Sequence, residues 1–219
     1  TLGDEVPAQG DPLAAARRRM VDDQIKARGV RNEAVLDVMA GVPRHLFVPP
    51  DVRGRAYDDT PLPIGYGQTI SQPYIVAYMT EALEVSRDHR ILEIGTGSGY
   101  QAAVLAGLVR QVFSIEIVPG LAESARRTLA DAGYRNVEVR TGNGYLGWPE
   151  RAPFDRIIVT AAPPAVPQAL VDQLAVGGRM VIPVGTLLQE IVVVTKDARG
   201  VTEERTIPVR FVPMVNEPR

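Results

Sequence analysis

Three alternate glycines that follow an acidic residue are the part of this sequence with the clearest chemical meaning. Residues 90–100 read Arg-Ile-Leu-Glu-Ile-Gly-Thr-Gly-Ser-Gly-Tyr, so Glu93 precedes Gly95, Gly97 and Gly99. Glycine lets the backbone approach a ligand closely and adopts positive φ readily. The helix expected after these glycines presents free N–H groups and the positive end of its dipole. The stretch therefore predicts a nucleotide-type binding site between a strand and a helix.

The spacing of the glycines and the charges beside them limit which ligands this site could bind. A dinucleotide fingerprint requires G-x-G-x-x-G, and the pattern fails here because the third position, counted from Gly95, is Tyr100. Glu93 would repel a pyrophosphate but suits a ligand that carries a cation. A second acid, Glu116, ends the next apolar run about 20 residues later, where a carboxylate can accept hydrogen bonds from ribose hydroxyls. A cation and a ribose together describe S-adenosylmethionine. The alternative is an ordinary βαβ turn with acids at its surface.

The elements that must position these residues alternate regularly along the chain. Strands are predicted at 91–94, 111–117, 137–141, 156–160 and 179–184, and helices at 99–108, 119–132 and 166–174. This alternation predicts an α/β fold with a doubly wound, mostly parallel, Rossmann-like sheet that has helices on both faces. Segments 190–195 and 202–211 predict a C-terminal antiparallel hairpin. Ligands of such sheets bind at the carboxyl ends of the strands, so the glycines, Glu116 and Asn143-Gly144 should converge on one crevice.

The chain before this core is predicted to be partly helical. Helices are expected over 11–29, 32–41 and 73–83. Segment 43–73 is rich in proline and glycine, and little regular structure is expected in it. Because it also carries apolar residues, we expect it to be ordered and functional.

We expect a single domain with a site for S-adenosylmethionine over residues 1–219. In this division residues 1–10 are disordered, residues 11–84 form an N-terminal helical extension and a loop that covers the substrate and cofactor, and residues 85–219 form the cofactor-binding core.

The composition excludes several classes of protein. The net charge of −2 gives no general basic field for nucleic acid. Without cysteine there are no disulfides and no thiol catalysis, and with only His45 and His89 a zinc site is not expected. No apolar run approaches the roughly 20 residues of a membrane span. We therefore expect a cytoplasmic protein with no metal, no nucleic-acid partner and no membrane partner.

The stretch before the glycines resembles a known family. Residues 63–74, Pro-Ile-Gly-Tyr-Gly-Gln-Thr-Ile-Ser-Gln-Pro-Tyr, are similar to the signature of protein-L-isoaspartate O-methyltransferases. The glycines with Glu93 and Glu116 resemble those of the class I S-adenosylmethionine-dependent methyltransferases. The likeness covers about residues 17–215 and includes three further stretches, 19–30, 42–49 and 209–215.

The resemblance implies a repair reaction. A methyl group passes from S-adenosylmethionine to the α-carboxylate of an isoaspartyl residue, which leaves S-adenosyl-L-homocysteine and an ester that cyclises to a succinimide. The implied partners are isoaspartyl-containing proteins and peptides, and a monomer is expected. Ser71 is the implied active-site residue. The implied cofactor-binding residues are Gln68, Thr69, Ile70, Glu93, Gly95, Gly97, Gly99, Glu116, Ile117, Asn143 and Gly144.

Some of these residues admit another interpretation or depart from the family. Ser71 donates a hydrogen bond that orients the acceptor carboxylate, or caps the helix over 73–83, or does both. Gln72 is the other candidate for the cap, and a cap would stabilise the helix by about 1 kcal/mol. Asn143 stands where the family usually has Asp, and an amide can still contact adenine because it has donors and an acceptor. The segment Gly185-Thr-Leu-Leu is shorter than the corresponding glycine-rich segment of the family.

Three other functions fit the sequence less well than this one. Methyltransferases that act on DNA amines typically carry Asn/Asp-Pro-Pro-Tyr after the fourth strand, whereas this chain has Thr160-Ala-Ala-Pro-Pro there. A cofactor-binding module without catalysis is the second alternative. A dehydrogenase is the weakest, because the third fingerprint glycine is missing.

Overall fold

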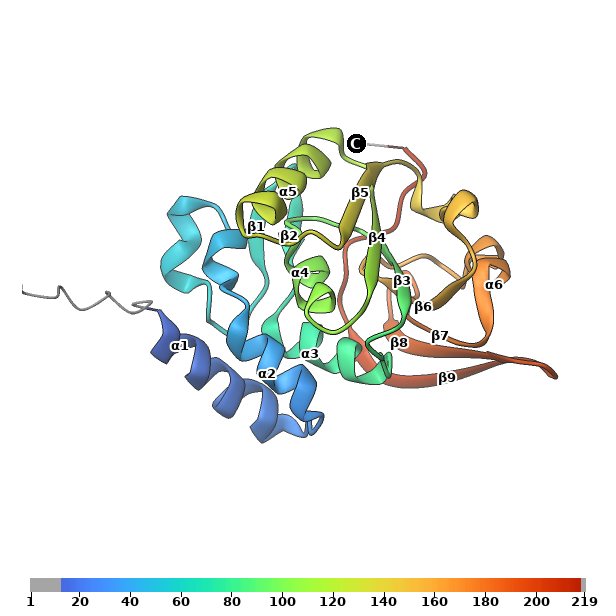
Figure 1. Cartoon of the computed structure of the whole chain (residues 1–219), viewed down its shortest axis with the longest axis horizontal. Coiled ribbons are helices and arrows are strands. Elements are labelled where there is room, and N and C mark those ends of the chain that lie inside the picture. Colours follow the sequence, from blue (N-terminus) through green and yellow to red (C-terminus); the bar gives the residue numbers. More distant parts are fainter. Residues whose placement is uncertain (1–12, 218–219) are drawn as a thin grey trace, which may run out of the picture.

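A mixed β-sheet forms the centre of the computed structural model, which describes residues 13–217. Within these residues, seven strands form one sheet in the order β5-β4-β3-β6-β7-β8-β9 (Figure 1). The pairs among β3 to β7 are parallel, and β7–β8 and β8–β9 are antiparallel. The strands are β3 Arg90–Ile94, β4 Gln111–Glu116, β5 Val137–Thr141, β6 Phe154–Val159, β7 Leu174–Val184, β8 Gln189–Asp197 and β9 Gly200–Val209. The predicted α/β sheet and its C-terminal antiparallel hairpin are confirmed.

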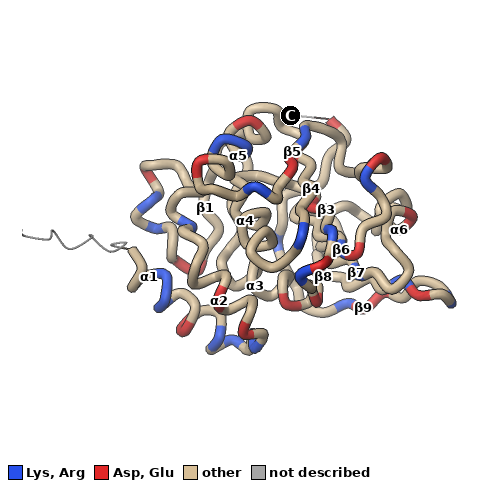
Figure 2. Tube along the Cα trace, viewed as in Figure 1, with Lys and Arg blue, Asp and Glu red and all other residues tan. Residues whose placement is uncertain are grey.

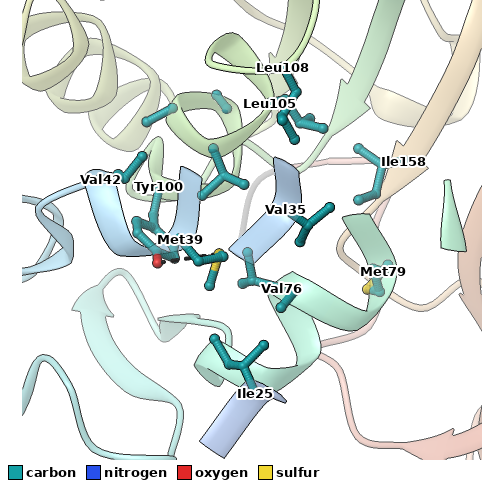
Figure 3. Packing of buried hydrophobic residues seen from close by; sticks show 14 of the residues in the cluster. Ile25, Val35, Met39, Val42, Val76, Met79, Tyr100, Leu105, Leu108 and Ile158 are labelled. Carbon is teal, nitrogen blue, oxygen red and sulfur yellow. Dashed lines mark hydrogen bonds between the residues drawn. The ribbon is translucent and has the colours of Figure 1, made fainter. Parts of the chain in front are cut away.

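Both faces of the central part of the sheet are covered, which is why β6, β7 and β8 contain continuous apolar runs. Neighbouring residues such as Ile91 and Leu92 point to opposite faces and belong to separate hydrophobic clusters. One cluster packs against helices α1 Ala14–Arg19, α2 Glu33–Gly41, α3 Pro73–Ala82, α4 Tyr100–Ala106 and α5 Pro119–Asp131. The other packs against α6 Gln168–Gln173 and the loop that contains Trp148. Figure 3 shows the first cluster, in which Met39 of α2 lies beside Tyr100 of α4 and accepts a hydrogen bond from its hydroxyl at 3.8 Å, and Val76 of α3 belongs to the same cluster.

The N-terminal helices agree with the sequence where the structure describes them. Helix α1 continues through a π-helical stretch, Met20–Ile25, into a 3₁₀ turn, Lys26–Arg28, and ends at Gly29 as expected. The Asn32 side chain accepts a hydrogen bond from the Val35 N–H and caps α2. The predicted start at 11–12 and the prediction for residues 1–10 lie outside the described residues. Between residues 13 and 217, no helix combines the length and the apolar character needed to cross a membrane.

The expectation of little regular structure in 43–73 is partly wrong. The segment holds short 3₁₀ helices at Arg44–Phe47 and Pro50–Arg55 and an antiparallel hairpin of β1 Leu62–Gly65 and β2 Gln68–Ile70. Its two-residue turn, Tyr66-Gly67, has positive φ at both positions, 54° and 69°. This is the backbone of a type I′ turn, which matches the twist of the strands that it joins.

One boundary in the core also differs from the prediction. The helix expected over 166–174 is shorter, and β7 begins at Leu174 rather than at residue 179. The register between β6 and β7 shifts between Phe154 and Arg156. Between these two pairs β7 has more residues than β6, and the extra residues lie around Gly177-Gly178. The sequence pattern alone places these residues in a turn.

Candidate active site

A cavity opens at the carboxyl ends of β3 and β4, in the crevice that the sequence predicts. Its wall is formed by the glycine turn after β3, the end of β4, strand β2 and the chain after β9. The wall includes most of the predicted site residues, namely Gln68, Thr69, Ile70, Ser71, Gly95, Gly97, Glu116, Ile117 and Gly144. Glu93, Gly99 and Asn143 do not line it.

Glycine is required at position 95 for two reasons. Its φ is +94°, and a Cβ added there would lie 2.5 Å from the Thr160 Oγ1. The Thr160 hydroxyl in turn donates to the carbonyls of Gly95, at 2.8 Å, and of Ile94, at 3.1 Å. Thr160, the residue that follows β6, therefore packs directly against the glycine turn and holds the floor of the cavity in place.

Glu116 joins the end of β4 to the same turn. Its carboxylate accepts the Gly97 N–H at 2.8 Å on Oε2 and the Val118 N–H at 3.0 Å on Oε1. Each carboxylate oxygen can accept more than one hydrogen bond. Because Glu116 also lines the cavity, it can hold the loop and still accept hydroxyl donors from a ligand.

The structure corrects the expectation for Glu93. Its side chain is fully buried beneath the turn, where the Ser114 hydroxyl donates to Oε2, and Ser114 is hydrogen-bonded to Thr96 at 2.6 Å. Burial raises the pKa of Glu93 to about 8, the hydrogen bond from Ser114 lowers it, and the nearby Glu116 raises it further. Glu93 is therefore mostly uncharged at pH 7. It supports Thr96, which does line the cavity, and it does not present a carboxylate to a cation.

Gly99 and Asn143 lie just outside the cavity and support its wall. Gly99 is the N-cap of α4 and packs against Leu129, which would be 3.2 Å from an added Cβ. The Asn143 side chain accepts the Tyr145 N–H at 2.9 Å and so caps the 3₁₀ turn Gly144–Leu146. Gly144 itself lines the cavity, and a Cβ there would come within 2.3 Å of the Ile94 side chain.

Ser71 lies where this cavity meets a second hollow. A groove beside it is walled by Arg28, Tyr74 and the chain from Ile207 to Val212, among others. Four residues line both the cavity and the groove: Thr69, Ser71, Thr160 and Val212. The cap interpretation of Ser71 is wrong, because the N-cap of α3 is Gln72 and no side chain caps this helix.

Several wall residues were not predicted from the sequence. Thr160 could have been found, because it follows the fourth strand at the carboxyl edge of the sheet. The segment 212–215 gave no such signal. It is held across the site by long-range hydrogen bonds, since the Ala162 N–H donates to the Val212 carbonyl at 2.8 Å and the Met214 N–H donates to the Ala162 carbonyl at 2.9 Å. Among residues 13–217, no group of three or more His, Asp or Glu side chains could hold a metal ion.

The family of the chain follows from its similarity to known proteins. The family model described as Protein-L-isoaspartate(D-aspartate) O-methyltransferase (PCMT) matches residues 15–219. The chain belongs to this family. Members of the protein-L-isoaspartate O-methyltransferase family use S-adenosylmethionine, and their fold is that of a class I methyltransferase.

Individual relatives agree with the family. A protein-L-isoaspartate O-methyltransferase from Synechococcus is 58% identical over 217 residues, covering 95% of this chain and 89% of that protein. One from Gloeobacter violaceus is 58% identical over 200 residues, covering 90% and 98%. A solved protein-L-isoaspartate O-methyltransferase superposes with a TM-score of 0.82 at 28% identity, covering 92% of this chain and 67% of that one. A Plasmodium falciparum structure in complex with S-adenosyl-L-homocysteine gives 0.80 at 25% identity, covering 92% and 99%.

Proposed function

We propose that this protein transfers a methyl group from S-adenosylmethionine to the free carboxylate of isoaspartyl residues in polypeptides. The observation that carries the proposal is the junction at Ser71, where the cavity under the glycine turn meets the groove along residues 207–212. A two-substrate transfer requires two binding sites that meet at one point. Here the cavity takes the cofactor, and the groove takes the polypeptide.

The residues of the cavity fit this cofactor. Glu116 accepts the ribose hydroxyls, Ile117 and Gly144 contact the adenine, and the turn from Gly95 to Gly97 approaches the amino-acid end. When bound, S-adenosylmethionine supplies a methyl group on a positively charged sulfur. In this proposal residues 85–219 hold the cofactor and the segment from 11–84, through strand β2, closes over it.

The acceptor requires little chemistry from the protein. A carboxyl group is already ionised at pH 7, so no general base is needed. The described walls of the cavity and groove agree with this, because they contain no histidine or lysine. Catalysis then depends on alignment and exclusion of water, which can lower a barrier by roughly 7–11 kcal/mol in well-oriented systems. The assigned role of Ser71 is to donate a hydrogen bond that holds the acceptor carboxylate in line.

Replacing Ser71 tests this assignment. A hydrogen bond to a charged group is worth about 1.5–3 kcal/mol, and part of it is lost as the carboxylate gives up its charge in the transition state. With an isoaspartyl peptide, the Ser71→Ala variant should therefore lose on the order of 10-fold in kcat/KM. The matched control is Ser124→Ala on the exposed side of α5, which should keep full activity. Full turnover by a folded Ser71→Ala protein would end the assignment.

We also infer that the protein works as a cytoplasmic monomer on polypeptides rather than on nucleic acid. The absence of cysteine suits a reducing compartment. Positive and negative positions are interspersed over the fold (Figure 2), and the net charge is −2. Light scattering after size exclusion should give the mass of one chain, and a dimer mass would contradict the monomer.

A further inference from the structure

The groove beside the proposed active site has an unusual charge distribution for a protein with a net charge of −2. Among the described residues that wall it, the charged side chains are two arginines, Arg28 and Arg210, with no acid. Both would therefore face a polypeptide bound in the groove.

The two arginines are not equivalent. Arg28 donates to Asp59 at 2.8 Å, and its guanidinium lies 3.6 Å from the centre of the Tyr74 ring. Its charge is neutralised and its position is fixed by these contacts. Arg210 is exposed, and within residues 13–217 it makes no side-chain hydrogen bond or ion pair. The positive charge available to a ligand of the groove is thus that of Arg210.

The backbone that carries Arg210 is held in place. The neighbouring Phe211 N–H donates to the Gln189 Oε1 at 2.6 Å, and the Gln189 amide donates back to the Phe211 carbonyl at 3.2 Å. A side chain on such a fixed backbone can act as a specificity element, because little ordering of the chain is required when a ligand binds.

Arg210 is unsuited to hold the reacting carboxylate itself. It lines the groove but not the cavity, whereas Ser71 and Val212 line both. A cation paired with the reacting carboxylate would also stabilise the substrate more than the transition state, since that negative charge disappears during methyl transfer. The partner of Arg210 must therefore be a second negative charge on the same polypeptide.

We propose that Arg210 is a specificity residue that selects acceptor segments with an acidic side chain two residues away from the isoaspartate. This rests on the proposed function. Arg210 lies two residues before Val212, and Val212 lines the junction of the cavity and the groove. Two residues of extended chain span roughly 7 Å. An extended acceptor with isoaspartate at the junction brings its second neighbour alongside Arg210.

The test uses isoaspartyl peptides with Glu, Gln or Lys at the second position before or after the isoaspartate. Binding to the protein loaded with S-adenosyl-L-homocysteine is measured by fluorescence anisotropy. The wild type should prefer Glu over Gln by about 2- to 5-fold at one of the two positions, as exposed ion pairs allow, and should disfavour Lys. Arg210→Gln should abolish this preference, and Arg210→Glu should reverse it. Arg199→Gln removes the same charge at the tip of the β8–β9 hairpin, where the side chain is 93% exposed, and should keep the wild-type preference.

Turnover with S-adenosylmethionine separates this inference from the proposed function. The preference should appear in KM and leave kcat unchanged, because the contact is equally strong in substrate and transition state. A wild type that binds the Glu, Gln and Lys peptides equally at both positions, or a preference that persists in Arg210→Gln, would overturn the role of Arg210. Failure of every protein to methylate any isoaspartyl peptide would overturn the proposed function instead, while the anisotropy comparison would still decide the role of Arg210.

Discussion

Replacing Glu93 with Gln should change how the stability of this protein depends on pH. The carboxyl group is fully buried below the glycine turn and accepts a hydrogen bond from Ser114. Burial raises the pKa of Glu93 to about 8 from an ordinary value of 4.5. Gln keeps the shape and the acceptor for Ser114, but it cannot ionise. The two proteins therefore differ in whether this position can take up a proton.

The direction of the effect follows from proton linkage. Between pH 4.5 and about 8, the native protein keeps a proton on Glu93 that the unfolded chain has released. The free energy of unfolding then falls by about 1.4 kcal/mol per pH unit. The stabilisation that the protonated, buried Glu93 contributes is fully present below pH 4.5 and is lost as the pH rises to about 8, over a window of about 3.5 pH units. The total loss is on the order of 5 kcal/mol, and the curve is flat above that window.

Urea unfolding from about pH 5 to pH 9 measures this effect. The unfolding free energy of Glu93→Gln minus that of the wild type should increase by several kcal/mol across the range, whatever its constant offset. Glu203→Gln, at an exposed position of β9, serves as the control and should show little change in this difference. Parallel curves for Glu93→Gln and the wild type at every pH would refute the assignment of a neutral, buried Glu93.

Three further substitutions test the site and the fold. Gly95→Ala should lower the free energy of unfolding by about 1–3 kcal/mol, because residue 95 has positive φ and an added Cβ would clash with Thr160. Calorimetry should also show weaker binding of S-adenosyl-L-homocysteine. Unchanged binding would contradict the position given to the cavity floor. Glu116→Gln leaves one acceptor oxygen for two backbone N–H groups, so the same calorimetry should show affinity reduced by about 10-fold or more; wild-type affinity would remove Glu116 from the site. Glu84 has a φ of +51° and an ion pair with Arg179 at 3.3 Å. In urea, Glu84→Gly should therefore have an unfolding free energy about 0.5–1 kcal/mol above that of Glu84→Ala, which loses the same ion pair, and a lower value would show that this conformation is not strained.

Local sequence patterns predicted the features that depend on neighbouring residues. The strand, glycine turn and helix of 90–106 are set by an apolar run, by residues that tolerate positive φ and by a helix-forming stretch, and all three lie within a few positions. The same holds for Glu116, which ends its strand at the edge where ligands of parallel sheets bind.

Features that depend on distant parts of the chain could not be predicted in this way. The state of Glu93 depends on its burial between strands, and periodicity does not reveal how completely a strand-end carboxylate is covered. Segment 212–215 reaches the cavity through hydrogen bonds to Ala162, some 50 residues earlier. The hairpin over 62–70 was also missed, because Tyr66 occupies a position of positive φ where glycine or asparagine is the usual signal.

The central claim is carboxyl methylation of isoaspartate, and one measurement tests it most directly. Two peptides that differ only in Asp or isoAsp at a single position are incubated with the protein and methyl-labelled S-adenosylmethionine, and base-labile methyl groups are counted. Label on the isoAsp peptide alone is the predicted result. Label on neither peptide, with cofactor binding confirmed by calorimetry, would contradict the account and favour a cofactor-binding protein without this activity or with a different acceptor.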